Sequence, residues 1–98
     1  MICHVVLLRL PEDHDAAELS AVMEGLAALD LPGLLSFGYG PNLDAEGLSP
    51  GYAYGFVVEF EDRAALDRYA ADPGHRALGG RLVALCGGGG IFVADLDV

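Results

Sequence analysis

The sequence contains no tryptophan, only two cysteines and only five basic residues among its 98 positions. Two cysteines are too few for a disulfide scaffold, which favours an ordinary reduced cytoplasmic protein. Fifteen acidic residues leave a formal net charge of −10, which repels phosphate and disfavours binding to nucleic acid or to anionic membrane surfaces. No apolar run approaches the roughly 20 residues that span a bilayer, and the first residues lack the pattern of a secretory signal.

What is present is typical of one folded domain. At 53% hydrophobic residues, the chain is too apolar to be disordered. Its length supports one modest core and is short for two, so residues 1–98 are expected to form a single domain.

Apolar periodicity predicts the secondary structure. The expected strands are residues 2–10, 34–41, 52–60 and 91–98. Helical spacing predicts one helix that Asp13 or Asp15 caps and that ends near residue 30. A second helical region follows the third strand and is split where Asp72 caps, and Pro73 begins, a new helix.

This β-α-β-β-α-β order is that of the ferredoxin-like α+β fold, with a four-stranded antiparallel sheet and helices on one face. By strand alternation, the other face carries Cys3, Val5, Leu7 and Val57. Left uncovered, these residues would form an exposed apolar patch. We therefore expect a homodimer in which two sheets pack face to face.

The sequence resembles the stress-responsive A/B barrel domain family, called Dabb, whose members form a dimeric α+β barrel. The similar pieces run through nearly the whole chain in order: residues 2–8, 32–33, 51–52, 57–60, 66–69, 73–75 and 93–95. Together they point to the family's fold and not to one activity. One plant member is a polyketide cyclase that closes a ring by aldol chemistry without metal or cofactor.

The resemblance to that cyclase implies three catalytic residues. Its histidine on the first strand matches His4, its histidine after the helix break matches His75, and a tyrosine just before the break matches Tyr69. A third histidine of the cyclase falls at Tyr54, where a weak acid replaces a base. The implied enzyme uses no cofactor and no metal.

Strand alternation and helix electrostatics suggest how these groups would act. His4 shares its predicted helix-facing side of the sheet with five residues expected to contact substrate: Val6, Leu8, Tyr54, Phe56 and Val58. His75 lies near a helix start, where the dipole and burial favour the neutral imidazole that a general base requires. The expected roles are His75 as base, His4 as its partner or as a second proton carrier, and Tyr69 with Tyr54 orienting the substrate oxygen.

Structural alternatives exist for each of these residues. His4 would then be a core histidine bonded to a backbone carbonyl, and His75 a solvated residue in a helix cap. Tyr54 and Tyr69 would be packing residues with hydrated hydroxyls. A zinc or copper site that combines Cys3, His4, Cys86 and Asp95 has no supporting spacing, so no metal is expected.

The candidate residues, their structural alternatives and the family resemblance leave three possible functions. The first is a cofactor-independent aldol-type cyclase or proton-shuttling isomerase that acts on a small, mostly apolar ketone or phenolic compound. The second is a non-enzymatic, stress-responsive dimeric barrel that binds hydrophobic ligands. The third is a cofactor-free monooxygenase, which related barrels imply.

Overall fold

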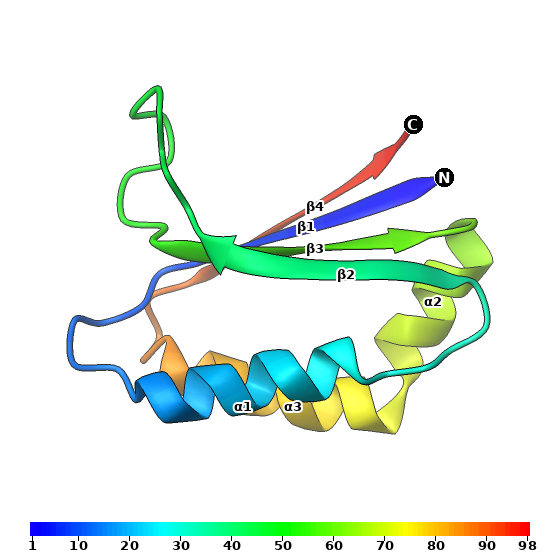
Figure 1. Cartoon of the computed structure of the whole chain (residues 1–98), viewed down its shortest axis with the longest axis horizontal. Coiled ribbons are helices and arrows are strands. Elements are labelled where there is room, and N and C mark those ends of the chain that lie inside the picture. The colour runs from blue at the N-terminus through cyan, green and yellow to red at the C-terminus, as the bar shows by residue number, and fades with distance from the viewer.

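The computed structural model describes residues 1–98, which form a sheet covered by helices on one side (Figure 1). The strands are β1 (Ile2–Leu8), β2 (Leu34–Pro41), β3 (Tyr54–Phe60) and β4 (Ile91–Asp97). The helices are α1 (Ala16–Ala27), α2 (Arg63–Ala71) and α3 (Pro73–Leu85). The predicted element order and the split of the second helical region are confirmed. No helix is long and apolar enough to cross a membrane.

Element boundaries differ slightly from the prediction. The third strand begins at Tyr54 and not at residue 52, because the Tyr52 amide donates to the Ser49 carbonyl within the preceding loop. Asp15, and not Asp13, caps α1, since its carboxylate accepts from the Glu18 amide at 3.0 Å. This cap satisfies an amide that has no partner inside the helix.

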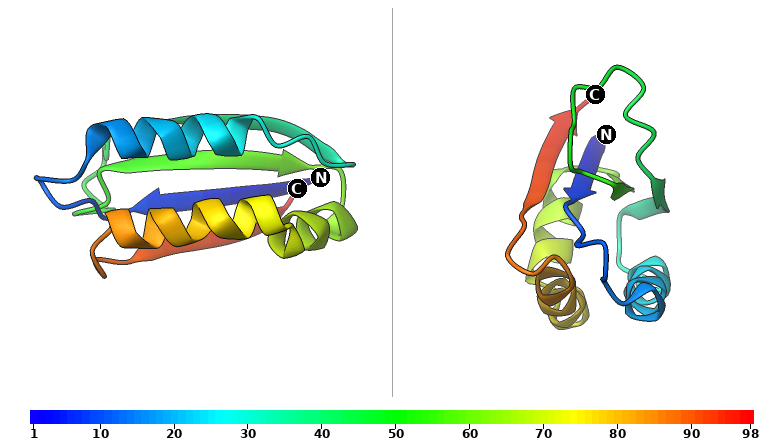
Figure 2. Two further views of the ribbon diagram at one scale, coloured as in Figure 1. Left: turned by 90° about the horizontal axis from the view of Figure 1, so that it is seen from below. Right: turned by 90° about the vertical axis from the view of Figure 1, so that its left-hand side faces the viewer.

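The sheet is antiparallel throughout, with the strand order β2-β3-β1-β4. β1 is therefore central, and His4 lies opposite Val58 on β3 and opposite Asp95 on β4. Figure 2 shows α1 and α3 side by side beneath the strands, with α2 at one end. This arrangement places β1 above the α2–α3 break.

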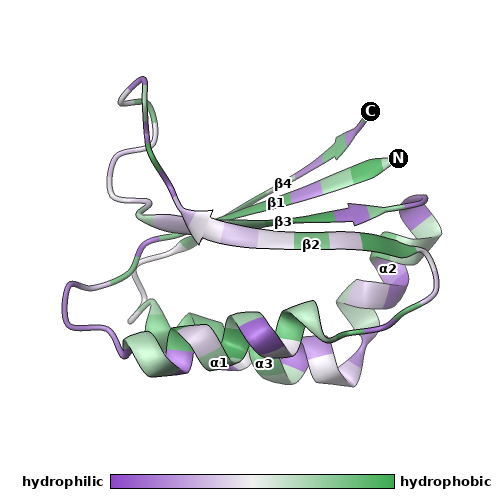
Figure 3. Cartoon of the chain, viewed as in Figure 1, coloured by the Kyte–Doolittle hydropathy of each residue, from purple (hydrophilic) through white to green (hydrophobic).

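The core lies between the two layers and contains no charged residue. From β1 and β3 it takes Val6, Leu8, Phe56, Val58 and Phe60, all on the helix-facing side. From α1 it takes residues at helical spacing: Leu19, Val22, Met23 and Leu26. Figure 3 shows apolar residues in both layers. The helix-facing side of the strands and the apolar side of α1 thus meet in one core, and this core includes four of the residues expected to contact substrate.

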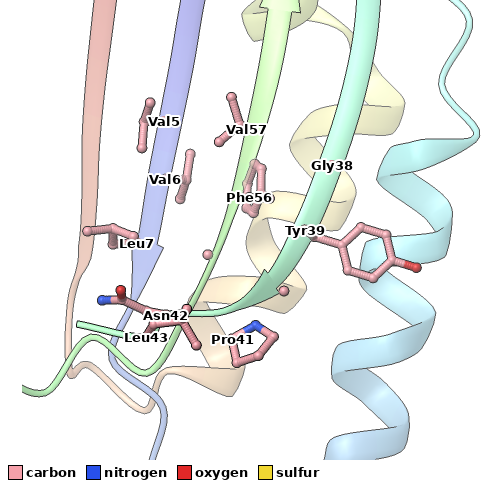
Figure 4. Close-up of a pocket in the computed structure, with 12 residues that line it drawn as sticks. Val5, Val6, Leu7, Gly38, Tyr39, Pro41, Asn42, Leu43, Phe56 and Val57 are labelled. Carbon is pink, nitrogen blue, oxygen red and sulfur yellow. The ribbon is translucent and has the colours of Figure 1, made fainter. Parts of the chain in front are cut away.

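The opposite face of the sheet has no helix over it (Figure 1). Val57, Phe92 and Leu96 are exposed on this face, and these residues are 39%, 49% and 53% accessible. A hollow of about 350 Å³ lies on it, with Val5 and Gly38 among the lining residues (Figure 4). The loop between β2 and β3 rises on the same side.

Candidate functional site

A cavity of about 420 Å³ opens between the first residues of β1 and the α2–α3 break. Its inner polar groups are His4, Tyr69 and His75. Two imidazoles 71 positions apart in the sequence therefore face one space. Two carboxylates of β4, those of Asp95 and Asp97, also border the cavity.

The remaining lining residues divide into apolar walls and a charged margin. Ile2, Leu66 and Ala70 supply apolar contact. Arg63 and Asp67 lie on the exposed side of α2, where the guanidinium Nε donates to the carboxylate at 3.1 Å. The cavity thus combines a small apolar wall with a polar inner end and a charged margin, and most of its lining residues are polar or charged.

The α2–α3 break positions Tyr69 and His75. α2 ends at Ala71, and Pro73 occupies the first turn of α3, where its missing N–H has no cost. The Asp72 carboxylate accepts from the His75 amide at 2.9 Å and so caps α3. This geometry brings the Tyr69 and His75 rings to 4.0 Å between centroids, at an angle of 38°.

His4 is held by a partner from the neighbouring strand. Its Nδ1 lies 2.5 Å from an Asp95 carboxylate oxygen, so Nδ1–H donates and Nε2 remains free. The His4 ring also meets Tyr69 edge-on at 5.7 Å. The four side chains form one continuous series: Asp95, His4, Tyr69 and His75.

Two buried polar atoms in this series have no hydrogen-bond partner: the Tyr69 hydroxyl and His75 Nδ1. A buried polar group without a partner lowers the free energy of unfolding by about 1–3 kcal/mol. Such groups are rare in folded proteins, and this cavity contains two of them. Tyr69 is only 1% exposed, and water reaches its hydroxyl poorly. A ligand oxygen or hydroxyl in the cavity would complete both groups.

The protonation states follow from burial. Burial raises the pKa of the Tyr69 phenol far above its usual value, so the hydroxyl keeps its proton and can donate. Burial also lowers the pKa of His75, and the charge of His4 lowers it further. The Ala70 carbonyl and the Asp72 carboxylate partly offset that decrease. His75 is therefore neutral around pH 7.

The five residues expected to contact substrate do not line this cavity. Leu8 and Val58 are fully buried in the core, and Val6 and Phe56 are nearly so. Tyr54 pairs with Leu8, four positions along β1 from His4, or roughly 13 Å at the rise of a strand. The alternation of side chains along the strands correctly predicted which side of the sheet these five residues face. It does not indicate where along the strand a cavity opens.

The sequence analysis named Asp95 only as part of a metal site without supporting spacing and gave it no catalytic role. Alternation along β4 places it on the helix-facing side, in line with His4 across the strands. The sequence did contain a signal for this role, because a carboxylate at an inward-facing strand position needs a hydrogen-bond donor or a cation beside it. The structure contains no group of three or more His, Cys, Asp or Glu residues arranged to hold a metal ion.

The chain belongs to the family described as the Stress responsive A/B Barrel Domain, Dabb, which matches residues 2–98. It matches no curated protein. The family assignment agrees with the resemblance seen in the sequence.

Three solved structures illustrate the likeness. The chain is 44% identical to a dimeric ferredoxin-like protein of unknown function from Jannaschia sp. CCS1, with a TM-score of 0.81 and coverage of 99% of this chain and 98% of that one. It is 22% identical to At3g17210 from Arabidopsis thaliana, with a TM-score of 0.86 and coverage of 100% and 95%. It is 14% identical to the hydroxynitrile lyase from Passiflora edulis, with a TM-score of 0.82 and coverage of 99% and 92%. The last two show the shared fold alone.

Proposed function

We propose that this Dabb protein is a cofactor-independent enzyme that moves a proton on a small, mostly apolar ketone or phenolic compound. The observation that carries the proposal is the unpartnered Tyr69 hydroxyl and His75 Nδ1, buried in one cavity with His4. A structural tyrosine and a structural histidine would be expected to find partners on folding. The Passiflora edulis neighbour supports the proposal only in showing that this fold accommodates an enzyme.

The proposed reaction is an aldol-type cyclisation or an isomerisation. An imidazole takes a proton from a carbon next to a carbonyl, and the C–H electron pair moves to the carbonyl oxygen to give an enolate. The Tyr69 hydroxyl donates to that oxygen and stabilises its charge. In cyclisation, the enolate carbon bonds to a second carbonyl carbon, whose oxygen then receives the proton. In isomerisation of an unsaturated ketone, a neighbouring C=C bond is conjugated with the enolate, and the proton returns to the far carbon of that bond while the double bond shifts.

The experiment follows α-proton exchange of acetophenone, a small neutral aromatic ketone, by NMR in deuterated water. We expect the protein to accelerate the exchange, and His4→Ala and His75→Ala each to lower the rate about 100-fold or more. The matched control is His14→Ala, because His14 lies in the turn before α1 and its Nδ1 contacts the Pro11 carbonyl at 2.7 Å. Equal rates for all three variants, or no acceleration by the wild type, would contradict the proposal.

A ligand-binding role is the second candidate, and the same two unpartnered groups favour it. A phenol can accept from the Tyr69 hydroxyl and donate to His75 Nδ1 without any reaction. Saturable binding of 4-ethylphenol by calorimetry, together with no exchange of acetophenone, would support this role. Oxygen uptake with an anthrone would instead support the monooxygenase alternative.

We also infer that the protein forms a homodimer through the open sheet face. Val57, Phe92 and Leu96 are exposed there, and the 44% identical Jannaschia protein is described as dimeric. In sedimentation experiments, Val57→Asp should shift the protein toward monomer. Val83→Asp is the matched control, since Val83 is exposed on α3, and it should leave the mass unchanged. A monomeric wild type would contradict the inference.

A cytoplasmic location is part of the same proposal. Cys3 and Cys86 are both free thiols, and Cys86 is buried. Unpaired cysteines are typical of a reducing compartment.

A further inference from the structure

We infer that Asp95 is a positioning residue that makes His4 the imidazole that takes the substrate proton, while His75 and Tyr69 hold the substrate oxygen. This inference rests on the proposed proton-transfer function. It reverses the roles that the sequence suggested for the two histidines. It also assigns a role to a carboxylate that the proposed reaction does not otherwise use.

The first argument is the pairing itself. The 2.5 Å contact between Asp95 and His4 Nδ1 joins two strands at directly opposed positions. The carboxylate can only accept, so it selects the tautomer with hydrogen on Nδ1 and a lone pair on Nε2. That lone pair is what a base presents to a C–H bond. Since Nδ1 is occupied by Asp95, Nε2 is the nitrogen left for a ligand in the cavity.

The second argument is the charge that a base acquires. An imidazole that takes a proton becomes a cation, and an adjacent carboxylate stabilises it, as in the Asp-His pairs of hydrolases. His4 has such a carboxylate in contact. No carboxylate contacts the His75 ring, because the Asp72 carboxylate accepts instead from the His75 backbone amide. Of the two rings, only that of His4 has a carboxylate in hydrogen-bond contact.

The third argument is the environment of His75. Its ring packs on Tyr69 at 4.0 Å, and its Nδ1 is buried without a partner. Burial and the charge of His4 both lower the pKa of His75, so a proton on His4 further disfavours a second one on His75. A neutral ring with a free nitrogen beside a neutral phenol suits hydrogen bonding to an oxygen on which charge develops.

The arrangement therefore defines two ends of the cavity. The proton-accepting end is His4 backed by Asp95, and the oxygen-binding end is Tyr69 with His75. The His4 and Tyr69 rings are 5.7 Å apart, which leaves both ends within reach of one small molecule. A ketone fits with its oxygen at the second end and its adjacent C–H toward the first. The proton moves to Nε2, and the C–H electron pair moves to the oxygen.

The first test is independent of any substrate. Long-range proton–nitrogen NMR of the free protein reports which ring nitrogen of His4 carries hydrogen. We expect the Nδ1–H form in the wild type and its loss in Asp95→Ala, because the acceptor is removed. Asp13→Asn, at an exposed position in the turn before α1, serves as control and should leave the His4 spectrum unchanged. An Nε2–H form in the wild type would overturn the inference.

The second test separates the two histidines by acetophenone exchange. Asp95→Asn should lower kcat about 100-fold with KM little changed, and Asp95→Glu should recover part of the loss. His75→Gln keeps an N–H donor, so its main effect should be a higher KM. His4→Gln should abolish the exchange.

If His75→Gln abolishes exchange while Asp95→Asn and His4→Gln retain it, the role assignment is wrong and the proposed function stands. If the wild type exchanges nothing, the proposed function fails, and the NMR result alone decides whether Asp95 positions His4.

Discussion

The Tyr69 and His75 rings lie 4.0 Å apart although they belong to different helices. Helix α2 ends at Ala71, and a new helix, α3, begins at Pro73 in a different direction. Both rings therefore enter one cavity. Had α2 continued without the break, residues six positions apart would have lain on different faces of the helix. The break that ends one helix therefore builds the polar end of the site.

Removal of the Tyr69 hydroxyl separates its functional role from its structural one. In Tyr69→Phe, the buried oxygen without a partner is gone, so the free energy of unfolding should stay equal or rise by about 1 kcal/mol. Acetophenone exchange should fall about 10- to 100-fold, because the donor to the enolate is lost. Urea unfolding and the exchange assay measure the two effects. Tyr39→Phe, at an exposed position on β2, is the control for exchange. A clear loss of stability with unchanged exchange would show a packing role.

The lowered pKa of His75 predicts a pH dependence of stability. Above the unfolded-state pKa of about 6.5, the ring is neutral in both states and its contribution is fully present. As the pH falls, the unfolded chain binds the proton first, so stability decreases until the folded-state pKa is passed. Urea unfolding of the wild type and His75→Gln between about pH 7.5 and pH 5 measures this. The variant should lose less stability over the range, and parallel curves would contradict the expectation.

Loss of the α3 cap should affect both stability and the site. Asp72→Ala removes the acceptor for the His75 amide and should cost about 1 kcal/mol, whereas Asp72→Asn should retain most of the cap. Because this cap fixes the first turn that carries His75, exchange should also slow. Asp15→Ala removes the corresponding cap of α1, far from the cavity, and should cost a similar free energy without slowing exchange. Equal effects on exchange would mean that the cap acts only through stability.

Two glycines of the open sheet face should differ in tolerance to alanine. A Cβ at Gly55 would lie 2.6 Å from the Val6 carbonyl oxygen, so Gly55→Ala should destabilise the fold by about 1–3 kcal/mol. A Cβ at Gly38 meets no atom within 4 Å, and Gly38→Ala should change stability by less than about 0.5 kcal/mol. Urea unfolding compares the two. A tolerated Gly55→Ala would show that β1 and β3 can separate at this point.

Much of the architecture was predictable because its causes are local. Alternation over a few residues showed which side of β1 and β3 enters the core, and capping residues showed where the helices begin. The break at Asp72-Pro73 followed from the missing N–H of proline. The uncovered apolar side of the sheet followed from the same alternation. Each of these features depends on neighbours within about one turn or one strand.

The walls of the cavity were not predictable in the same way. Tyr54 and Val58 share one side of β3, but only the end of the sheet near His4 is adjacent to the cavity, which opens at the α2–α3 break. Alternation carries no information on which stretch of a buried face is covered tightly and which is left open. That depends on where helices from elsewhere in the chain end.

The sequence by itself determined the elements, their order and the inward side of His4, because these depend on short-range periodicity. Only the tertiary structure decided that Asp95 meets His4, 91 positions away, and that Tyr69 lies between His4 and His75. The β1–β4 register and the angle of the split helix set those contacts. Both are fixed by packing of the whole core, where a shift of one residue would turn each strand's inward side chains outward.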